Sequence, residues 1–194
     1  ITEGSTYAEA DFTFNGNAEV KATEANTYPM GLKASDFTNN NTNYSSVTFV
    51  VNDGSLVINP KSIIPDGPNT PDEKKTGIEV TKPADSKYDG KEHKEVLTVT
   101  DTKTGATLVK DTDYTLSYSK DVINVGTVTV TVKGKGNYTG EFTKRYQITP
   151  REYTVTTDSA EKPYDGTALT AGGKVSGIVK GETVDFTITG SQTS

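Results

Sequence analysis

The strongest pattern of this sequence is an alternation of apolar and polar residues within 109–150. Residues 114–119 alternate Tyr or Leu with Thr or Ser, and residues 127–133 alternate Val with Thr or Lys. Successive side chains of a strand point to opposite faces, so this pattern predicts two strands with one buried face. A third strand is expected at 142–148, ending before Pro150, which has no amide hydrogen for a ladder. The apolar face of such a sheet requires a second layer that covers it.

The composition favours the same class and excludes several functions. The 194 residues include 18 Gly, one Met and no Trp, which indicates β structure with frequent turns. The net charge of −6 is spread over interleaved Lys, Asp and Glu, and this excludes the basic surface of a nucleic-acid-binding protein. The chain has no Cys, which excludes disulfides and thiolate metal sites. We expect no membrane insertion in this fragment, because no run of about 20 apolar residues is present.

Internal repeats divide the sequence into modules. A Tyr-Asp-Gly turn signal occurs twice, and other short segments recur at a similar distance. This self-similarity predicts a repeat of roughly 75 to 90 residues. The similar pairs of segments are 87–90 with 162–166, 108–110 with 178–180, 43–45 with 137–139, 57–60 with 147–150, and 11–14 with 185–188.

These repeats predict four segments along the chain. Residues 1–60 correspond to the back part of a repeat, 78–150 to a complete β repeat module, and 151–194 to the start of a further one. Residues 61–77 are rich in Pro and are expected to form an extended, semi-rigid linker. We therefore predict an all-β fold of tandem small antiparallel β modules, Ig-like sandwich or β-grasp-like, in an elongated arrangement.

Two local structures are expected within the first segment. Residues 32–37 are predicted to form a short helical turn with Ser35 as its cap. The Asp-Gly pair at 53–54 is a strong signal for a two-residue hairpin turn. That hairpin would join a strand at 47–51 to one at 56–58.

No group of residues in the sequence indicates catalysis, a cofactor or a metal. His93 is the only His, and the partners of a catalytic triad or a metal site are missing, so we interpret it as a solvated surface residue. Several acidic and hydroxyl residues could supply oxygen ligands to calcium, but their spacing matches no calcium loop, and we expect solvated turns. These residues are Asp101, Thr102, Thr104, Asp111 and Asp113.

The repeated Tyr-Asp-Gly admits two interpretations. Tyr88 and Tyr164 could stack on sugar rings if they are exposed beside the turn. The structural interpretation, which we favour, is that the Tyr packs over the sheet edge while Asp-Gly supplies the positive φ angles of a tight turn.

Small modules without Cys need other support. One possibility is an isopeptide bond between side chains, for which Lys87, Lys162 and Asn124 are nominal candidates. Another is a neighbouring repeat, and here we expect Tyr146 and Tyr153 to pack at the junction that follows Pro150. We favour support from the neighbouring repeat.

Three segments carry a resemblance to a known group of proteins. Residues 27–60, 113–150 and 164–190 resemble the tandem MBG-type and bacterial Ig-like repeats of large surface proteins from Gram-positive gut bacteria. The resemblance implies an exported, cell-wall-attached, adhesin-like protein. It transfers no functional residue, since strand and turn residues define such repeats.

Two functions from different classes follow. The first is a non-catalytic stalk segment of an extracellular cell-surface protein, which contacts neighbouring repeats of its own chain and, through its loops, host glycans, mucin or surface proteins. The second is an accessory carbohydrate-binding module of a secreted glycan-degrading enzyme. Exposed aromatic residues clustered on one face would favour the second.

Overall fold

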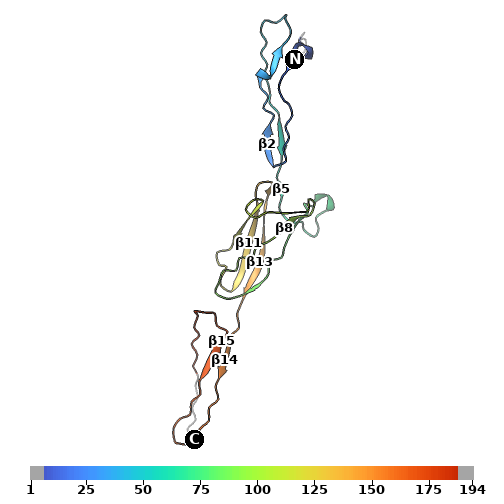
Figure 1. Ribbon diagram of the computed structural model, residues 1–194. Coiled ribbons are helices and arrows are strands. Elements are labelled where there is room, and N and C mark those ends of the chain that lie inside the picture. Colours follow the sequence, from blue (N-terminus) through green and yellow to red (C-terminus); the bar gives the residue numbers. More distant parts are fainter. Residues whose placement is uncertain (1–6, 188–194) are drawn as a thin grey trace. The chain divides into compact units, whose positions relative to one another are not determined.

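The computed structural model describes residues 7–187 of the chain, which form short strands and three 3-10 turns but no α-helix (Figure 1). The ends of the expected first and last modules, residues 1–6 and 188–194, lie outside this range. The chain folds as two compact units. Within the described residues, the first unit consists of residues 7–78, 101–115 and 133–141, and the second of residues 79–100, 116–132 and 142–187.

Two small antiparallel sheets form the early part of the first unit. The sheet β1-β3 brings Phe12 opposite Asn39, and β2-β4 brings Asn26 opposite Ile58. The ring of Phe37 lies 5.5 Å from that of Phe49, so aromatic contacts support the first sheet. The elements are η1 (Glu9–Asp11), β1 (Phe12–Phe14), β2 (Asn26–Pro29), η2 (Ala34–Asp36), β3 (Phe37–Asn39) and β4 (Ser55–Ile58).

The hairpin expected around 53–54 is wrong. Residues 47–51 form no strand, and β4 pairs with β2 instead. The reason lies in the Asp53 carboxylate, which accepts hydrogen bonds from the backbone N–H groups of Gly31 (2.9 Å) and Leu32 (3.0 Å). These bonds hold β2 and β4 together at the end of a longer loop, so the Asp-Gly pair closes that loop and not a two-residue turn.

The helical turn predicted at 32–37 is present as η2, but Ser35 is not its cap. The Asp36 carboxylate accepts a hydrogen bond of 2.7 Å from the backbone N–H of Lys33, the residue before the turn. Ser35 lies inside the turn. The capping carboxylate therefore comes from the end of the turn and bonds back to its start.

Residues 61–77 have more structure than a free linker. They contain β5 (Lys61–Ser62), which pairs in parallel with β12 (Tyr138–Thr139), and η3 (Asp72–Lys74). The side chain of Ile63 is 0% exposed. The backbone pairing and this burial hold the start of the segment in place. The prolines of the segment disfavour an α-helix. The division of the chain into repeat modules stays a prediction.

The segment 109–150, in which apolar and polar residues alternate, supplies three of the four strands of the largest sheet. The strand order of this sheet is β10-β11-β13-β7. The three strands predicted there are confirmed, and β13 ends at Thr149, directly before Pro150. β7 lies beside the end of β13 in parallel, with Ser86 opposite Ile148. The bounds are β7 (Ser86–Lys87), β10 (Tyr114–Tyr118), β11 (Gly126–Gly134) and β13 (Glu141–Thr149).

A three-stranded sheet of order β6-β8-β9 supplies further buried side chains. Its strands are β6 (Ile78–Val80), β8 (Val99–Asp101) and β9 (Ala106–Thr107). Among the described residues, the buried hydrophobic side chains of the core all fall between 63 and 148 in the sequence. They are Ile63, Ile78, Leu97, Val99, Leu108, Tyr114, Val122, Val128, Val130, Val132, Tyr146 and Ile148.

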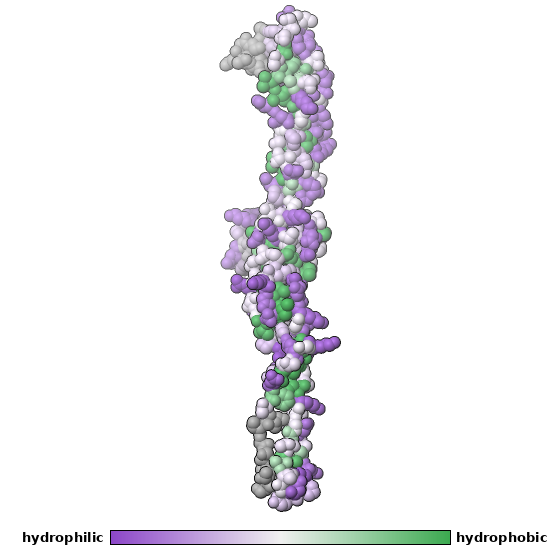
Figure 2. Space-filling model, turned by 90° about the vertical axis from the view of Figure 1, so that its left-hand side faces the viewer, coloured by the Kyte–Doolittle hydropathy of each residue, from purple (hydrophilic) through white to green (hydrophobic). Residues whose placement is uncertain are grey.

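The last part of the second unit is a two-stranded antiparallel sheet of β14 (Thr154–Thr157) and β15 (Gly173–Ser176). Its described side chains are all exposed or half-buried. Figure 2 shows polar residues over much of the visible surface, with apolar residues in small separate patches. The chain is therefore all-β, built from several small, mainly antiparallel sheets, as predicted.

Candidate functional site

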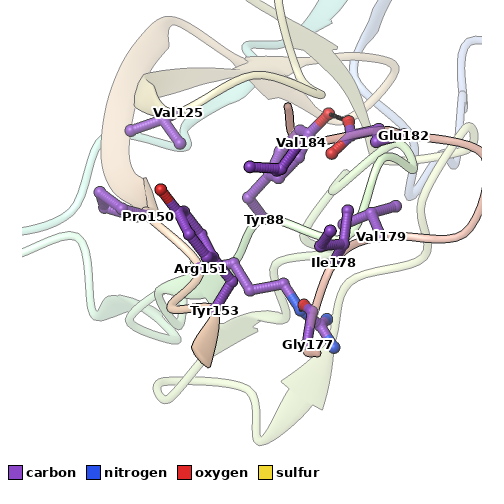
Figure 3. Close-up of a pocket in the computed structure, with 10 residues that line it drawn as sticks. All are labelled: Tyr88, Val125, Pro150, Arg151, Tyr153, Gly177, Ile178, Val179, Glu182 and Val184. Atoms are coloured by element: carbon purple, nitrogen blue, oxygen red, sulfur yellow. Dashed lines mark hydrogen bonds between the residues drawn. The ribbon is translucent and has the colours of Figure 1, made fainter. Parts of the chain in front are cut away.

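The second unit contains a hollow of about 270 Å³ where the chain leaves β13 (Figure 3). Tyr88 and Pro150 line it together with residues of the 151–184 segment, which returns to this point after β15. Most of its surface is apolar, and Val, Ile and Pro side chains supply it together with the ring of Tyr153. The polar groups at its edge are those of Tyr88, Arg151 and Glu182.

These polar groups bond to each other or to the backbone. The Tyr88 hydroxyl donates a hydrogen bond to the Glu182 carboxylate (Figure 3). The acceptor carboxylate, followed by burial and the negative charges nearby, raises the pKa of the Tyr88 phenol. The Arg151 Nε donates to the backbone oxygen of Gly177 at 2.7 Å. The Tyr88 bond therefore joins the 151–184 segment to the strands before it, and the Arg151 bond holds two parts of that segment together; we call the site the C-terminal junction.

Two glycines allow the backbone to approach closely at the C-terminal junction. Gly177 has φ +88°, and a Cβ there would lie 3.1 Å from the backbone oxygen of Glu152. A Cβ on Gly90 would lie 3.0 Å from Cγ1 of Val179. Because both positions also have positive φ, side chains would strain the backbone as well as crowd the contact.

The two Tyr-Asp-Gly copies form the same turn but differ in their tyrosines. In each copy the Asp carboxylate accepts a hydrogen bond from the backbone N–H two residues later, at 3.0 Å in 88–91 and 2.9 Å in 164–167. The glycines have φ +75° and +76°. Tyr88 is half-buried, whereas the side chain of Tyr164 is 84% exposed. The expected Asp-Gly turn is therefore confirmed in both copies, but the expected packing of the Tyr over the sheet edge is wrong for Tyr164.

The prediction that His93 is a solvated surface residue is wrong. Its side chain is only 17% exposed, and its Nε2 lies 2.9 Å from Oδ1 of Asp89, in the turn four residues earlier. The pKa of the Asp89 carboxyl is held below its usual value, chiefly by the backbone N–H of Lys91 and to a smaller extent by His93. The turn folds the imidazole back onto the chain, an effect that a lone polar residue in a sequence does not reveal.

Asp101, expected in a solvated turn, is instead 1% exposed. Its carboxylate lies 2.5 Å from the Lys61 ammonium and accepts a hydrogen bond of 3.0 Å from the backbone N–H of Lys103. Burial alone would raise the pKa of Asp101, but the hydrogen bond and charge of Lys61, together with the backbone N–H groups of Lys103 and Thr104, lower it more in total. The alternation of Leu97, Val99 and Asp101 on one face was the sequence signal for this burial.

Two of the other candidate calcium ligands bond to partners within the protein, in their own loop or in a neighbouring segment. The Asp113 carboxylate accepts from the backbone N–H of Val109 at 2.7 Å, and the Thr102 hydroxyl donates to the oxygen of Gly77 at 2.9 Å. Thr104 and Asp111 lie in the same turns. Among residues 7–187, no three His, Asp or Glu side chains gather in a way that could hold a metal ion.

The nominal crosslink residues have nearer partners. The Lys162 ammonium lies 2.7 Å from Oδ1 of Asp165, and the Asn124 side chain donates to Asp121 at 2.8 Å. Lys87 is exposed. Lys162 and Asn124 thus contact other residues and not each other, and the Lys162–Asp165 pair lies within one partly exposed turn and not between adjacent strands.

The two tyrosines expected at the junction have different places. Tyr153 lines the hollow and is 56% exposed. Tyr146 is 2% exposed, and its hydroxyl donates to the backbone oxygen of His93. Its expected junction role is therefore wrong, because its alternation with Ile148 places it on the buried face of β13. Tyr88, which the sequence indicated only as part of the repeated turn, is at the junction.

Comparison of the chain with family models, with curated proteins and with solved structures gave no match. Within the described part of the chain, no helix is long and apolar enough to cross a membrane. Functional inference therefore depends on the residues themselves.

Proposed function

We propose that the chain is a non-catalytic structural segment of a bacterial cell-surface protein, a stalk outside the cell that also presents its loops to host glycans or proteins. The observation that carries this proposal is that specific hydrogen bonds join each end segment to the rest of its unit. In the second unit this is the bond from Tyr88 to Glu182 at the C-terminal junction, while the bond from Arg151 to Gly177 braces the end segment itself. A stalk needs such joints, because flexible connections would let its segments swivel.

The first unit has a comparable joint. The Asn137 side chain accepts a hydrogen bond from the backbone N–H of Ala25 at 2.6 Å and donates one to the Glu24 carboxylate. The parallel pair β5-β12 begins beside it. Together these contacts attach residues 24–62 to the turn that precedes β12, through backbone as well as side-chain bonds.

The resemblance to MBG-type and bacterial Ig-like repeats supports the location. From this resemblance we infer modules of the Ig-like sandwich or β-grasp-like kind, in an exported protein attached to a Gram-positive cell wall. The absence of Cys agrees with an exported rod from an organism that does not rely on disulfides.

The alternative is a carbohydrate-binding module, and one observation favours it. Tyr153 presents its ring to the hollow at 56% exposure, and Tyr164 is 84% exposed. Aromatic faces of this kind stack on sugar rings. In the alternative, the hollow takes a glycan and the chain serves a secreted glycan-degrading enzyme.

A glycan and mucin array with the whole chain separates the two functions. A stalk with weak loop contacts predicts low binding that stays the same in Tyr153→Ala and Tyr164→Ala. Strong binding to one glycan class, lost in Tyr153→Ala, would replace the stalk by the binding module. Antibodies raised against the chain should label intact cells that produce it, and labelling only after permeabilisation would contradict the surface location.

A further inference from the structure

We propose that the pair β5-β12 is a mechanical clamp, the contact that resists unfolding when the chain is pulled from its two ends. The inference deepens the proposed function, since it matters for a stalk under tension. It follows from the direction of the two strands and from the order in which the chain enters and leaves them.

The clamp strands run in the same direction. β5 is where the chain enters after Pro60, and Lys61 and Ser62 lie opposite Tyr138 and Thr139 of β12. The backbone N–H of Lys61 donates to the oxygen of Asn137, and that of Ile63 donates to the oxygen of Thr139, both at 2.8 Å. Along residues 59–63, the first backbone-to-backbone hydrogen bonds with the segment 109–150 are therefore those of this parallel pair. Bonds between parallel strands are slanted relative to the strands.

The chain leaves the clamp at the end opposite to the one at which it entered. After Thr139 it passes Gly140, whose backbone oxygen accepts from Gly134 N–H at 2.9 Å at the end of β11. It then continues as β13 to Thr149. Tension therefore pulls β5 back toward residue 60 and pulls β12 forward toward residue 150.

Because the strands are parallel and the forces opposite, the strands slide past each other and both backbone bonds are loaded together. A force that separated the same strands from one end would break the bonds one after the other. Forced unfolding depends on the barrier to the first rupture, so the shared load gives the higher resistance.

Side chains reinforce the entering strand. Ile63, directly after β5, is 0% exposed, so sliding of β5 would pull an apolar side chain out of the core. The Lys61 ammonium lies 2.5 Å from the buried Asp101 carboxylate, at the end of β8. Withdrawing Lys61 would leave that carboxylate buried without its cation, which adds to the resistance.

Single-molecule pulling of the whole chain in two directions tests the clamp. The chain has no Cys, so two introduced cysteines are unique handles. Asn59→Cys with Glu152→Cys applies tension along the strands, and Asn59→Cys with Lys135→Cys applies it across one end of the pair. All three positions are exposed. The second pair is the matched control, because only the direction of the load differs.

We expect the force at the first rupture to be about twofold or more higher along the strands than across their end, at equal loading rate. Equal forces, or a higher force across the end, would overturn the clamp. Lys135→Cys removes the hydrogen bond that Lys135 donates to the backbone oxygen of Asp111. If Lys135→Cys lowers the melting temperature, Lys133→Cys, which is also exposed, replaces it as the handle. The glycan and mucin array tests the stalk function without using the clamp. A failed pulling experiment would therefore overturn the clamp and leave the stalk function standing.

Discussion

His93 has an environment unlike that of an exposed loop residue. The imidazole is mostly covered, and its Nε2 faces the Asp89 carboxylate. We predict that His93→Ala lowers the free energy of unfolding by about 1 kcal/mol, because Asp89 loses a partner and the space is left unfilled. Urea unfolding measures the change, with the exposed Lys94→Ala as control, which should stay within about 0.5 kcal/mol. Equal values for the two variants would show that the contact contributes nothing.

Asp66 links the stability of the chain to pH. Its carboxylate accepts hydrogen bonds from the backbone N–H groups of Thr76 (2.7 Å) and Gly77 (2.8 Å), and the Thr76 bond is the main cause of its lowered pKa. A carboxyl with a lowered folded-state pKa stabilises the fold above its unfolded pKa of about 4 and loses that contribution as the pH falls through the folded value. The carboxyls with the same direction of shift are Asp89, Asp101, Asp121 and Asp165.

We therefore predict that the melting temperature falls as the pH drops below about 4, and that Asp66→Asn shows a smaller fall. Thermal melting from pH 7 to pH 2 measures this. Asp72→Asn is the control, since that side chain is 92% exposed. A fall in Asp66→Asn as large as in the parent would show that Asp66 does not take part in the acid response.

For single residues, the sequence predicts burial where the buried positions follow the alternation of a strand. Asp101 continues the face of Val99, so its burial was readable from the pattern, although its Lys61 partner lies 40 positions away. The partner of His93 is close in sequence but depends on how one turn folds. Tyr88 meets Glu182 only because a distant segment returns to it.

Among the elements, the strands with the clearest alternation were predicted with the correct type, and the strand expected at 56–58 is also present as β4 although its expected partner is not. β10, β11 and β13 each bury one face, and this burial fixes their register. β2 and β4 have no buried side chain, so hydrogen bonds to Asp53 decide their pairing. Such a pairing leaves no period in the sequence, and the Asp-Gly signal was therefore misleading.

Gly134 tests the turn that connects β11 to β12. A Cβ at this position would lie 2.7 Å from the backbone nitrogen of Thr139, and backbone atoms cannot rotate away as a side chain can. We predict that Gly134→Ala lowers the free energy of unfolding by about 1–3 kcal/mol. Gly67→Ala is the control, since its only near atom is the Thr70 hydroxyl oxygen at 3.6 Å. Chemical unfolding of both variants measures the difference, and equal stability would mean that the turn yields easily.

In the whole molecule, apolar burial is concentrated in one part of the described sequence, within 63–148. The segment that follows Pro150 gains support through the C-terminal junction. We predict that a chain ending at residue 150 melts several degrees lower than the full chain. A loss of about 1 kcal/mol lowers the melting temperature of a domain of about 60–100 residues by about 4–8 °C. Calorimetry of the two chains checks this, and an unchanged melting temperature would mean that the junction adds no stability.

Amide hydrogen exchange of the whole chain is the most direct measurement of this concentration of stability. Amides open locally with free energies that rise with the packing around them. If the buried faces of β11 and β13 hold the fold, their hydrogen-bonded amides should exchange at least about tenfold more slowly than those of β14 and β15, which have no buried side chain. Equally slow exchange in β14 and β15 would contradict the account, because stability would then not depend on the 63–148 core.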